Sequence, residues 1–167
     1  NYTGAIFDMD GLMFDTENIY QETWSELAAE NGVTLGKDFV ADICGTSGAH
    51  MCRVIEKHYG VADGSMIMEE CMKRVRQKLK VYVPKKPGID RILKAFHDRG
   101  VRLAVASSSY PEQIESNLRL AGVREYFDAV VSGKSVEHGK PAPDIFFLAA
   151  KQIKCDPETC YVFEDSE

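Results

Sequence analysis

The chain has 167 residues, 44% of them hydrophobic and 28% charged, and its formal net charge is −6, which is typical of one globular domain or of one domain with a modest insertion. The negative net charge argues against a general nucleic-acid-binding protein, which would normally carry a positive net charge. No apolar run approaches the roughly 18 residues of a membrane span, and the first residues lack the regions of a signal peptide, so we expect no membrane partner.

The first half of the chain is expected to form one strand and then helices. Residues 5–7 are apolar and end at Asp8, as in a short buried strand. After them apolar residues recur at helical spacing in three segments, the second over about residues 47–59. The first and third segments carry Tyr20, Trp24, Leu27 and Ala28, and Met68, Met72, Val75 and Leu79. Residues 16–83 are therefore expected to be all-helical.

Beyond Pro84 the pattern changes to helices alternating with strands. Helices are expected around residues 89–96, 111–121 and 143–153, and strands over 101–107, 127–132 and 160–165. This alternation implies right-handed βαβ units and a parallel sheet. The expected fold class is α/β, with a Rossmann-like sheet core over 1–15 and 84–167 and a helical insertion over 16–83.

Polar side chains follow each expected strand. In an open parallel sheet, ligands bind beyond the carboxyl ends of the strands, so these side chains should converge on one edge. In chain order they are Asp8, Asp10 and Gly11, then Ser107, Ser108 and Ser109, then Lys140, and finally Glu164 and Asp165.

This residue set favours phosphoryl chemistry. Carboxylates are tolerated side by side when a hard cation neutralises them, and Mg²⁺ prefers oxygen ligands and phosphate oxygens. One carboxylate could then attack phosphorus, and its neighbour could move protons. Lys140 and a serine hydroxyl would hold the phosphate, and Gly11 would let backbone amides approach an anion.

Each feature taken alone has a plainer interpretation. The Asp8–Asp10 pair alone is typical of a solvated turn, the serines of a polar loop or helix cap, and Lys140 of a surface lysine. The pair Glu164–Asp165 could cap a following helix. Their joint occurrence at successive strand ends favours a functional site.

The cysteines indicate a reducing compartment. Their number is odd and no CxxC pair occurs, which is typical of free thiols that bind no metal. We therefore expect a cytoplasmic protein. The five residues are Cys44, Cys52, Cys71, Cys155 and Cys160.

The strand-end residues resemble the motifs of the haloacid dehalogenase-like superfamily, in its phosphatase and β-phosphoglucomutase branch. The four motifs occur in order as DMDGLMFDTE, VASSS, GKPAPDIF and VFEDS. The resemblance spans residues 2–167 and implies that the helical insertion is a cap domain. It also leads us to expect that the C-terminal part of the fold, another strand-helix-strand stretch, is missing from this chain.

The resemblance implies a role for each matching residue. Asp8 would be the nucleophile that forms an aspartyl phosphate, and Asp10 the general acid and base. The phosphoryl group would be held by Gly11, Leu12, Ser107, Ser108 and Lys140. The Mg²⁺ cofactor would be held by Asp8, the Asp10 backbone carbonyl, Glu164 and Asp165.

The resemblance favours hydrolysis of a small phosphorylated metabolite, such as a sugar phosphate, over mutase chemistry. Mutases of this branch carry a histidine where this chain has Tyr20 and an arginine where it has Gly48, and both serve a bisphosphate intermediate. A β-phosphoglucomutase-like enzyme remains the first alternative. A receiver-like phosphorylation switch, which lacks a helical insertion, and a truncated, non-catalytic phosphate-binding domain are the others.

The segment from Lys73 to Lys86 is rich in lysine and arginine, although the chain as a whole has a net charge of −6. A solvated helix face is the plainer interpretation. The functional one is that Lys73 reaches the substrate. The substrate itself and the oligomeric state do not follow from the sequence.

Overall fold

The computed structural model describes residues 2–44, 46 and 48–165. Ser47, where the second helix was expected to begin, and Ser166 of the VFEDS motif lie outside the described residues. The chain divides into two compact units. The sheet unit comprises Asn1–Thr16 and Lys80–Glu167, and the helical unit comprises Glu17–Leu79.

The sheet unit contains four parallel strands, which confirms the expected α/β class. They are β1 (Gly4–Phe7), β2 (Arg102–Ser107), β3 (Ala129–Ser132) and β4 (Cys160–Phe163), in the order β3-β2-β1-β4. β3 begins two residues later than expected, because Asp128 accepts a hydrogen bond from the Leu103 N–H at 2.9 Å through its side chain instead of lying in the strand.

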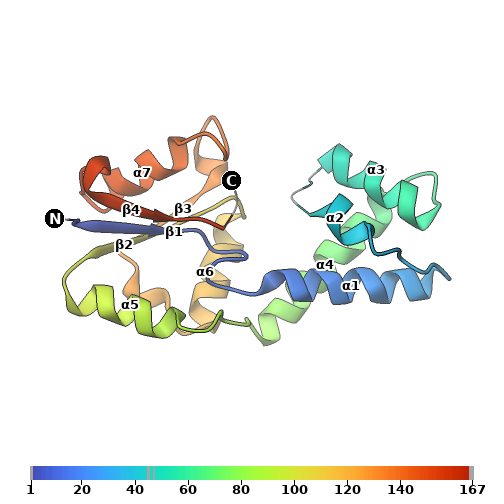
Figure 1. The fold of residues 1–167 in the computed structure, drawn as a ribbon, viewed down its shortest axis with the longest axis horizontal. Coiled ribbons are helices and arrows are strands. Elements are labelled where there is room, and N and C mark those ends of the chain that lie inside the picture. The colour runs from blue at the N-terminus through green and yellow to red at the C-terminus, as the bar shows by residue number, and fades with distance from the viewer. Residues whose placement is uncertain (1, 45, 47, 166–167) are drawn as a thin grey trace. The chain divides into compact units, whose positions relative to one another are not determined.

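Helices cover both faces of this sheet (Figure 1). They are α5 (Ile89–Asp98) and α6 (Pro111–Leu120) on one face, and α7 (Asp144–Gln152) on the other. The short 3-10 helices were not expected from periodicity, since three residues carry too little of it. They are η1 (Arg124–Tyr126), η2 (Gly133–Ser135) and η3 (Pro157–Thr159).

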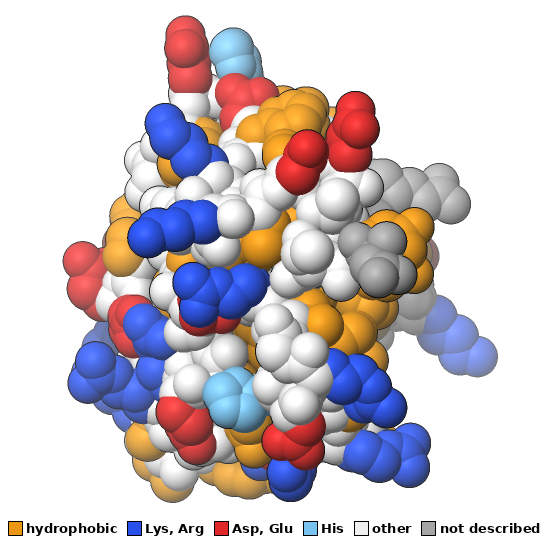
Figure 2. All heavy atoms as spheres, turned by 90° about the vertical axis from the view of Figure 1, so that its left-hand side faces the viewer, with side chains coloured by type: hydrophobic (Ala, Val, Ile, Leu, Met, Phe, Trp, Pro, Cys, Tyr) orange, Lys and Arg blue, Asp and Glu red, His pale blue; other side chains and the backbone are white. Residues whose placement is uncertain are grey.

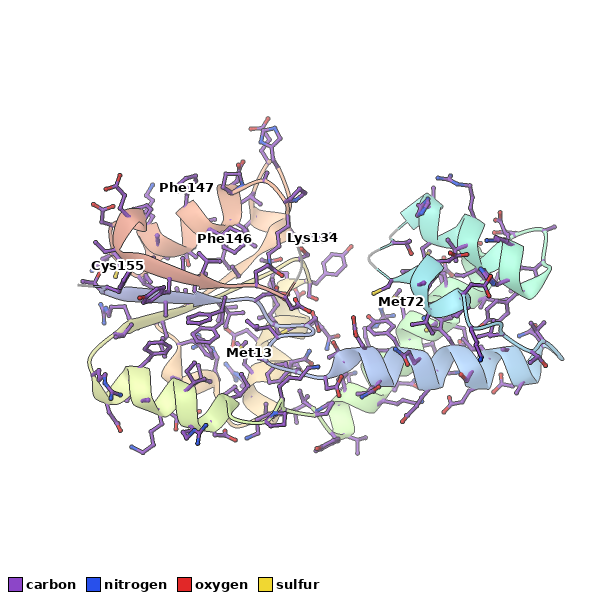
Figure 3. The ribbon with its side chains drawn as sticks, in the orientation of Figure 1. Met13, Met72, Lys134, Phe146, Phe147 and Cys155 are labelled. Carbon is purple, nitrogen blue, oxygen red and sulfur yellow. The ribbon has the colours of Figure 1, made fainter. Side chains whose placement is uncertain are left out.

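The two faces of the sheet are packed differently. Against α7 the sheet presents Ile6 and small residues, chiefly Ala104 and Ala106, which lets the helix approach closely. Figure 3 shows Phe146 on the sheet side of α7 and Phe147 on its outer side. On the opposite face Phe7 stacks on Phe163 with ring centroids 4.6 Å apart. The strands are therefore anchored from both sides, which holds their carboxyl ends in place.

The helical unit contains α1 (Thr16–Glu30), α2 (Phe39–Ile43), α3 (Gly48–Tyr59) and α4 (Ser65–Val81). Its core forms around Trp24, Phe39 and Tyr59, which are all buried. The Tyr59 hydroxyl donates to the Trp24 carbonyl at 2.6 Å, and burial raises the pKa of Tyr59. The five-residue α2 was not expected, because it is too short to show a helical period.

The basic side chains of α4 pair with acids of the same unit. Arg74 donates to both carboxylate oxygens of Glu30, at 2.7 and 2.8 Å, and Lys78 donates to Glu26 at 2.8 Å. Lys73 lies 3.3 Å from Glu70, and its side chain is 60% exposed. These contacts support the interpretation of a solvated, ion-paired helix face.

Charged side chains of both signs share the surface of the molecule (Figure 2). Figure 2 shows a face of the molecule on which Lys and Arg side chains are interspersed with Asp and Glu. Among the described residues, no helix combines the length and the apolar character needed to cross a membrane.

Candidate active site

The expected site residues meet at the carboxyl edge of the sheet. Phe7 is the last residue of β1, and it pairs with Val105 of β2 and Phe163 of β4. Asp8 and Glu164 therefore leave neighbouring strands side by side. The Asp8 N–H donates to the Phe163 carbonyl at 2.9 Å, which continues the ladder by one hydrogen bond and holds Asp8 at this edge.

Lys140 joins two of the carboxylates. Its Nζ donates to Asp8 Oδ1 at 2.6 Å and to Glu164 Oε2 at 2.5 Å. The side chains of Lys140, Asp8 and Glu164 are only 16%, 10% and 21% exposed. The Nζ also lies 5.3 Å from the ring centroid of Phe146, which supports the lysine from its apolar side. The lysine is thus held with its charge between two acids.

The environment of Asp8 suits a reactive carboxylate. The pKa of Asp8 is raised to about 6, chiefly by burial and also by the charge of Glu164, against the lowering effect of the hydrogen bond and the charge of Lys140. A poorly solvated carboxylate is a better nucleophile than one in bulk water, and the ammonium group of Lys140 favours the ionised form that attacks.

Three carboxylates form a group that could hold a cation. Oxygen atoms of Asp8, Glu164 and Asp165 all lie within 4.8 Å of one another. Two oxygens bound to one Mg²⁺ ion lie at most about 4.2 Å apart, so small side-chain rotations would bring all three to one ion. This all-oxygen donor set therefore fits Mg²⁺ better than a soft metal. The Asp10 side chain does not belong to the group.

A second set of ligating groups lies in the helical unit. Oxygen or nitrogen atoms of Asp38, Asp42 and His58 also lie within 4.8 Å of one another. However, Asp42 Oδ2 is engaged by Lys57 at 2.8 Å and by His58 at 2.7 Å. The pKa of Asp42 is lowered, first by the hydrogen bond from Lys57 and then by that from His58. This set is an ion-paired link between α2 and α3.

Gly11 makes room for Asp165. Its φ is +80°, in the left-handed region, and a Cβ at this position would collide with the Asp165 carboxylate. The Gly11 N–H donates to the Phe14 carbonyl at 2.9 Å, so this amide is engaged inside the turn. Within the described part of the chain, the Leu12 N–H makes no backbone hydrogen bond. Of these two backbone amides, Leu12 therefore remains the candidate donor to a phosphate.

Asp10 is held by two hydroxyls. Thr16 Oγ1 donates to Asp10 Oδ1, and Ser109 Oγ donates to Asp10 Oδ2, each at 3.1 Å. Burial raises the pKa of Asp10, while these two hydrogen bonds lower it. Ser109 was expected at this edge from the sequence without a role of its own, and Thr16 was not expected there. The SSS run was a signal for Ser109, but nothing local singles out Thr16.

The serine loop is tied to two strands. Ser107 is buried at the end of β2, and its Oγ accepts from the Ser109 N–H at 3.2 Å. Ser132 Oγ, at the end of β3, donates to the Ser109 carbonyl at 2.6 Å. Ser108 is exposed. The structure thus brings the serine loop, Asp10, Asp8 and Lys140 to one edge, as the strand order requires.

Comparison with known proteins identifies the family. The family model described as haloacid dehalogenase-like hydrolase matches residues 5–167. The chain belongs to this family. A relative from Escherichia coli K12, the fructose-1-phosphate phosphatase YqaB, is 34% identical over 99% of this chain and 88% of its own length. The resemblance inferred from the four motifs is therefore confirmed, and the chain is a haloacid dehalogenase-like enzyme.

Two further comparisons support the same assignment. A phosphorylated carbohydrates phosphatase from Thermotoga maritima is 31% identical, over 98% of this chain and 76% of the relative. The crystal structure of CbbY from Rhodobacter sphaeroides in complex with xylulose-1,5-bisphosphate has 25% identity and a TM-score of 0.76. The match covers 99% of this chain and 79% of that one. This haloacid dehalogenase-like hydrolase thus resembles two proteins named as phosphatases of phosphorylated carbohydrates and one whose crystal structure contains a sugar bisphosphate.

Proposed function

We propose that this enzyme hydrolyses monophosphate esters of small carbohydrates or polyols through an aspartyl phosphate on Asp8. The observation that carries the proposal is the position of Lys140 Nζ between Asp8 and Glu164. A cation in this place would stabilise the negative charge of a phosphoryl group next to Asp8. The names of the two phosphatase relatives support a carbohydrate substrate.

The proposed reaction has two steps. In the first, an oxygen of Asp8 forms a bond to phosphorus, the ester P–O bond breaks, and Asp10 donates a proton to the departing alcohol. In the second, Asp10 takes a proton from water while the water attacks the phosphorus of the aspartyl phosphate. This step releases inorganic phosphate and restores Asp8. Burial of Asp10, which raises its pKa, favours the protonated form that the first step needs.

Mg²⁺ would be held by Asp8, Glu164 and Asp165, with the Asp10 backbone carbonyl as the further ligand implied by the family motif. When bound, the ion supplies charge neutralisation for the acids and the phosphoryl oxygens. The phosphate itself would be held by Lys140, the Ser107 hydroxyl, the Leu12 amide and the two loops that contain Gly11 and Ser108. In this proposal the helical unit is the cap that receives the alcohol part of the ester.

The helical unit favours hydrolysis over mutase chemistry. Tyr20 and Gly48, which stand where mutases of this branch carry a histidine and an arginine, line one cavity of this unit. Neither can clamp a second phosphate as a guanidinium does. Membership of a hydrolase family also favours an enzyme over a receiver-like switch.

The test is to incubate the protein and Mg²⁺ with a hexose 1-phosphate and a panel of other sugar and polyol phosphates. We expect free phosphate from at least one compound, and no hexose 6-phosphate. Accumulation of hexose 6-phosphate would establish the mutase alternative. Absence of any phosphate release across the panel and from an aryl phosphate would overturn the proposal.

We expect Gly11→Ala to impair both stability and catalysis, because the added Cβ meets the Asp165 carboxylate. Gly122→Ala is the matched control, since Gly122 has a φ of +70° in the same unit and no atom within 4 Å of such a Cβ. Both variants should lose about 1–3 kcal/mol of folding free energy from backbone strain. Only Gly11→Ala should also raise the Mg²⁺ concentration needed for half-maximal phosphate release, and equal Mg²⁺ requirements would contradict this role.

A further inference from the structure

Two cysteines meet at the amino end of the sheet, opposite to the edge that carries the candidate active site. Cys160 is the first residue of β4 and pairs with Gly4, the first residue of β1. Cys155 follows α7, and Figure 3 shows it at the far end of the sheet unit from Lys134. Both thiols are half-buried and pack against the apolar cluster under α7. The structure therefore holds them together in a place that the proposed catalysis does not use.

Gly4 leaves the space that both sulfur atoms face. A Cβ at this position would lie 2.7 Å from Cys160 Sγ and 3.2 Å from Cys155 Sγ. The distance between the two sulfurs therefore cannot exceed the sum of these two values. Burial raises the pKa of the Cys160 thiol, and the neighbouring Cys155 thiol raises it further. Since a disulfide requires an S–S distance of about 2.05 Å, rotation of the two side chains toward each other is the motion that bond formation requires.

The turn between the two cysteines is fixed by hydrogen bonds. The Cys155 N–H donates to the Ala150 carbonyl at 3.0 Å, which ties the first thiol to the end of α7. The Asp156 side chain accepts from the Glu158 N–H at 3.0 Å, and the Asp156 carbonyl accepts from the Thr159 N–H at 2.9 Å. The fold therefore holds the loop between the thiols closed before any bond forms, so oxidation requires little further loss of chain entropy.

Cys155 is the thiol that a reagent reaches first. It lines an open cavity of about 590 Å³ at this end of the sheet, whereas Cys160 is not among the described lining residues. The charged residues that the structure describes in this lining are three cations and one acid, namely Arg99, Arg102, Lys154 and Asp156. Arg102 is paired with Asp128, yet a surplus of positive charge remains, which attracts an anionic reagent. The raised pKa of Cys160 makes this thiol the slower nucleophile near neutral pH.

We propose that Cys155 and Cys160 are a redox-active pair, which a small anionic disulfide such as oxidised glutathione converts into an intramolecular disulfide. In the first step ionised Cys155 attacks one sulfur of the oxidant, and the S–S bond of the oxidant breaks. The thiolate that leaves takes up the proton lost by Cys155. In the second step Cys160 loses its proton and attacks the Cys155 sulfur, and the second thiol leaves with that proton. The protein thus loses two electrons and two protons, and the oxidant gains them.

The test is a redox titration of the full chain, reduced at the start, in buffers with varied ratios of reduced and oxidised glutathione. An acid quench and an alkylating reagent preserve the thiol state, and trypsin then releases both cysteines in one peptide that begins at Cys155. We expect this peptide to lose two hydrogen atoms and to escape alkylation as the share of oxidised glutathione rises. Dithiothreitol should restore both thiols.

Folding should favour the disulfide. In concentrated urea the loop must close from a flexible chain, whereas in the folded protein the two thiols are already neighbours. We expect the equilibrium constant for oxidation by glutathione to be at least about tenfold larger in the folded protein than in urea. By linkage, the oxidised protein is then more stable than the reduced protein by the same factor, so it should unfold at a higher urea concentration.

Single substitutions identify the order of attack. Cys160→Ser should accumulate a mixed disulfide between Cys155 and glutathione, because no second thiol remains to resolve it. Cys155→Ser should leave Cys160 largely as a free thiol. Cys52→Ser is the matched control, since it removes a half-buried thiol from the helical unit. It should titrate as the wild type does.

Three results would overturn the proposal. The first is a wild-type peptide that holds two free thiols or only mixed disulfides at every glutathione ratio. The second is preferential bonding of either cysteine to Cys44, Cys52 or Cys71, and the third is an equal oxidation constant in the folded protein and in urea. The wild-type titration needs no variant, so it decides the matter even where a substitution prevents folding.

Two further outcomes separate the parts of the proposal. A mixed disulfide on Cys160 in the Cys155→Ser variant, without one on Cys155 in the Cys160→Ser variant, would reverse the assigned order of attack. The cysteine pair does not depend on the proposed function. A protein that forms the disulfide and releases no phosphate would therefore refute the proposed function alone.

Discussion

Asp8→Asn is expected to lower the rate of phosphate-ester hydrolysis at least about a thousandfold, because a neutral amide cannot act as the nucleophile. The substitution keeps the size of the side chain, and Lys140 retains Glu164 as a partner at 2.5 Å. The fold should therefore persist. Phosphate release from an aryl phosphate measures the rate, and thermal unfolding followed by circular dichroism checks the fold.

The matched control for Asp8→Asn is Asp90→Asn. It removes an equal charge from the same unit, at a side chain that is 61% exposed and paired with Lys85. This variant should keep wild-type activity. Near-normal turnover by a folded Asp8→Asn variant would show that the nucleophile assignment is wrong.

Lys140→Met should lower the rate about a hundredfold to a thousandfold, the usual effect of removing one group that stabilises transition-state charge. It should also lower the unfolding temperature, because Asp8 and Glu164 then face each other without the ammonium group. The loss should stay below the roughly 3–5 kcal/mol of a fully buried broken pair, since these side chains retain some exposure. Mg²⁺ should recover more stability in the variant than in the wild type, because it replaces the missing positive charge.

Lys134→Met is the control for this second substitution. Lys134 follows β3 and is exposed, with its Nζ 4.9 Å from the ring centroid of Tyr110 (Figure 3). Its loss removes the same charge without touching the carboxylates, so activity should be unchanged. If Lys140→Met and Lys134→Met have equal activity and equal response to Mg²⁺, Lys140 has no special role at the site.

Much of the fold could be predicted from local pattern. Apolar runs such as 101–107 predict strands, and residues such as Pro111 and Gly122 mark helix ends, because burial and backbone conformation act over a few residues. The shortest elements escaped prediction, as α2 and the 3-10 helices show. Their few residues carry no period, and packing of Phe39 against the unit's core stabilises α2 instead.

The candidate site was predicted as a set of residues, and the roles of its members remain predictions. Strand-end positions singled out Asp8, Lys140 and Glu164, because parallel strands bring their carboxyl ends to one edge. The pattern did not reveal that Lys140 contacts both acids. In the sequence Lys140 is separated from Asp8 by 132 positions and from Glu164 by 24. Such partnerships depend on how loops run after the strands end.

The amino-acid pattern alone was sufficient for the α/β class, the helical insertion and the acidic strand ends, since each follows from residue type and short-range spacing. Three-dimensional packing was needed to select Ser109 and Thr16 as the partners of Asp10. Neighbouring serines of one loop have the same side chain, and only the backbone conformation decides which hydroxyl points to Asp10. It was needed again to gather Glu17, Trp24 and Met72 around one cavity. Contacts between distant segments are formed by burial of the whole unit, and no local signal encodes them.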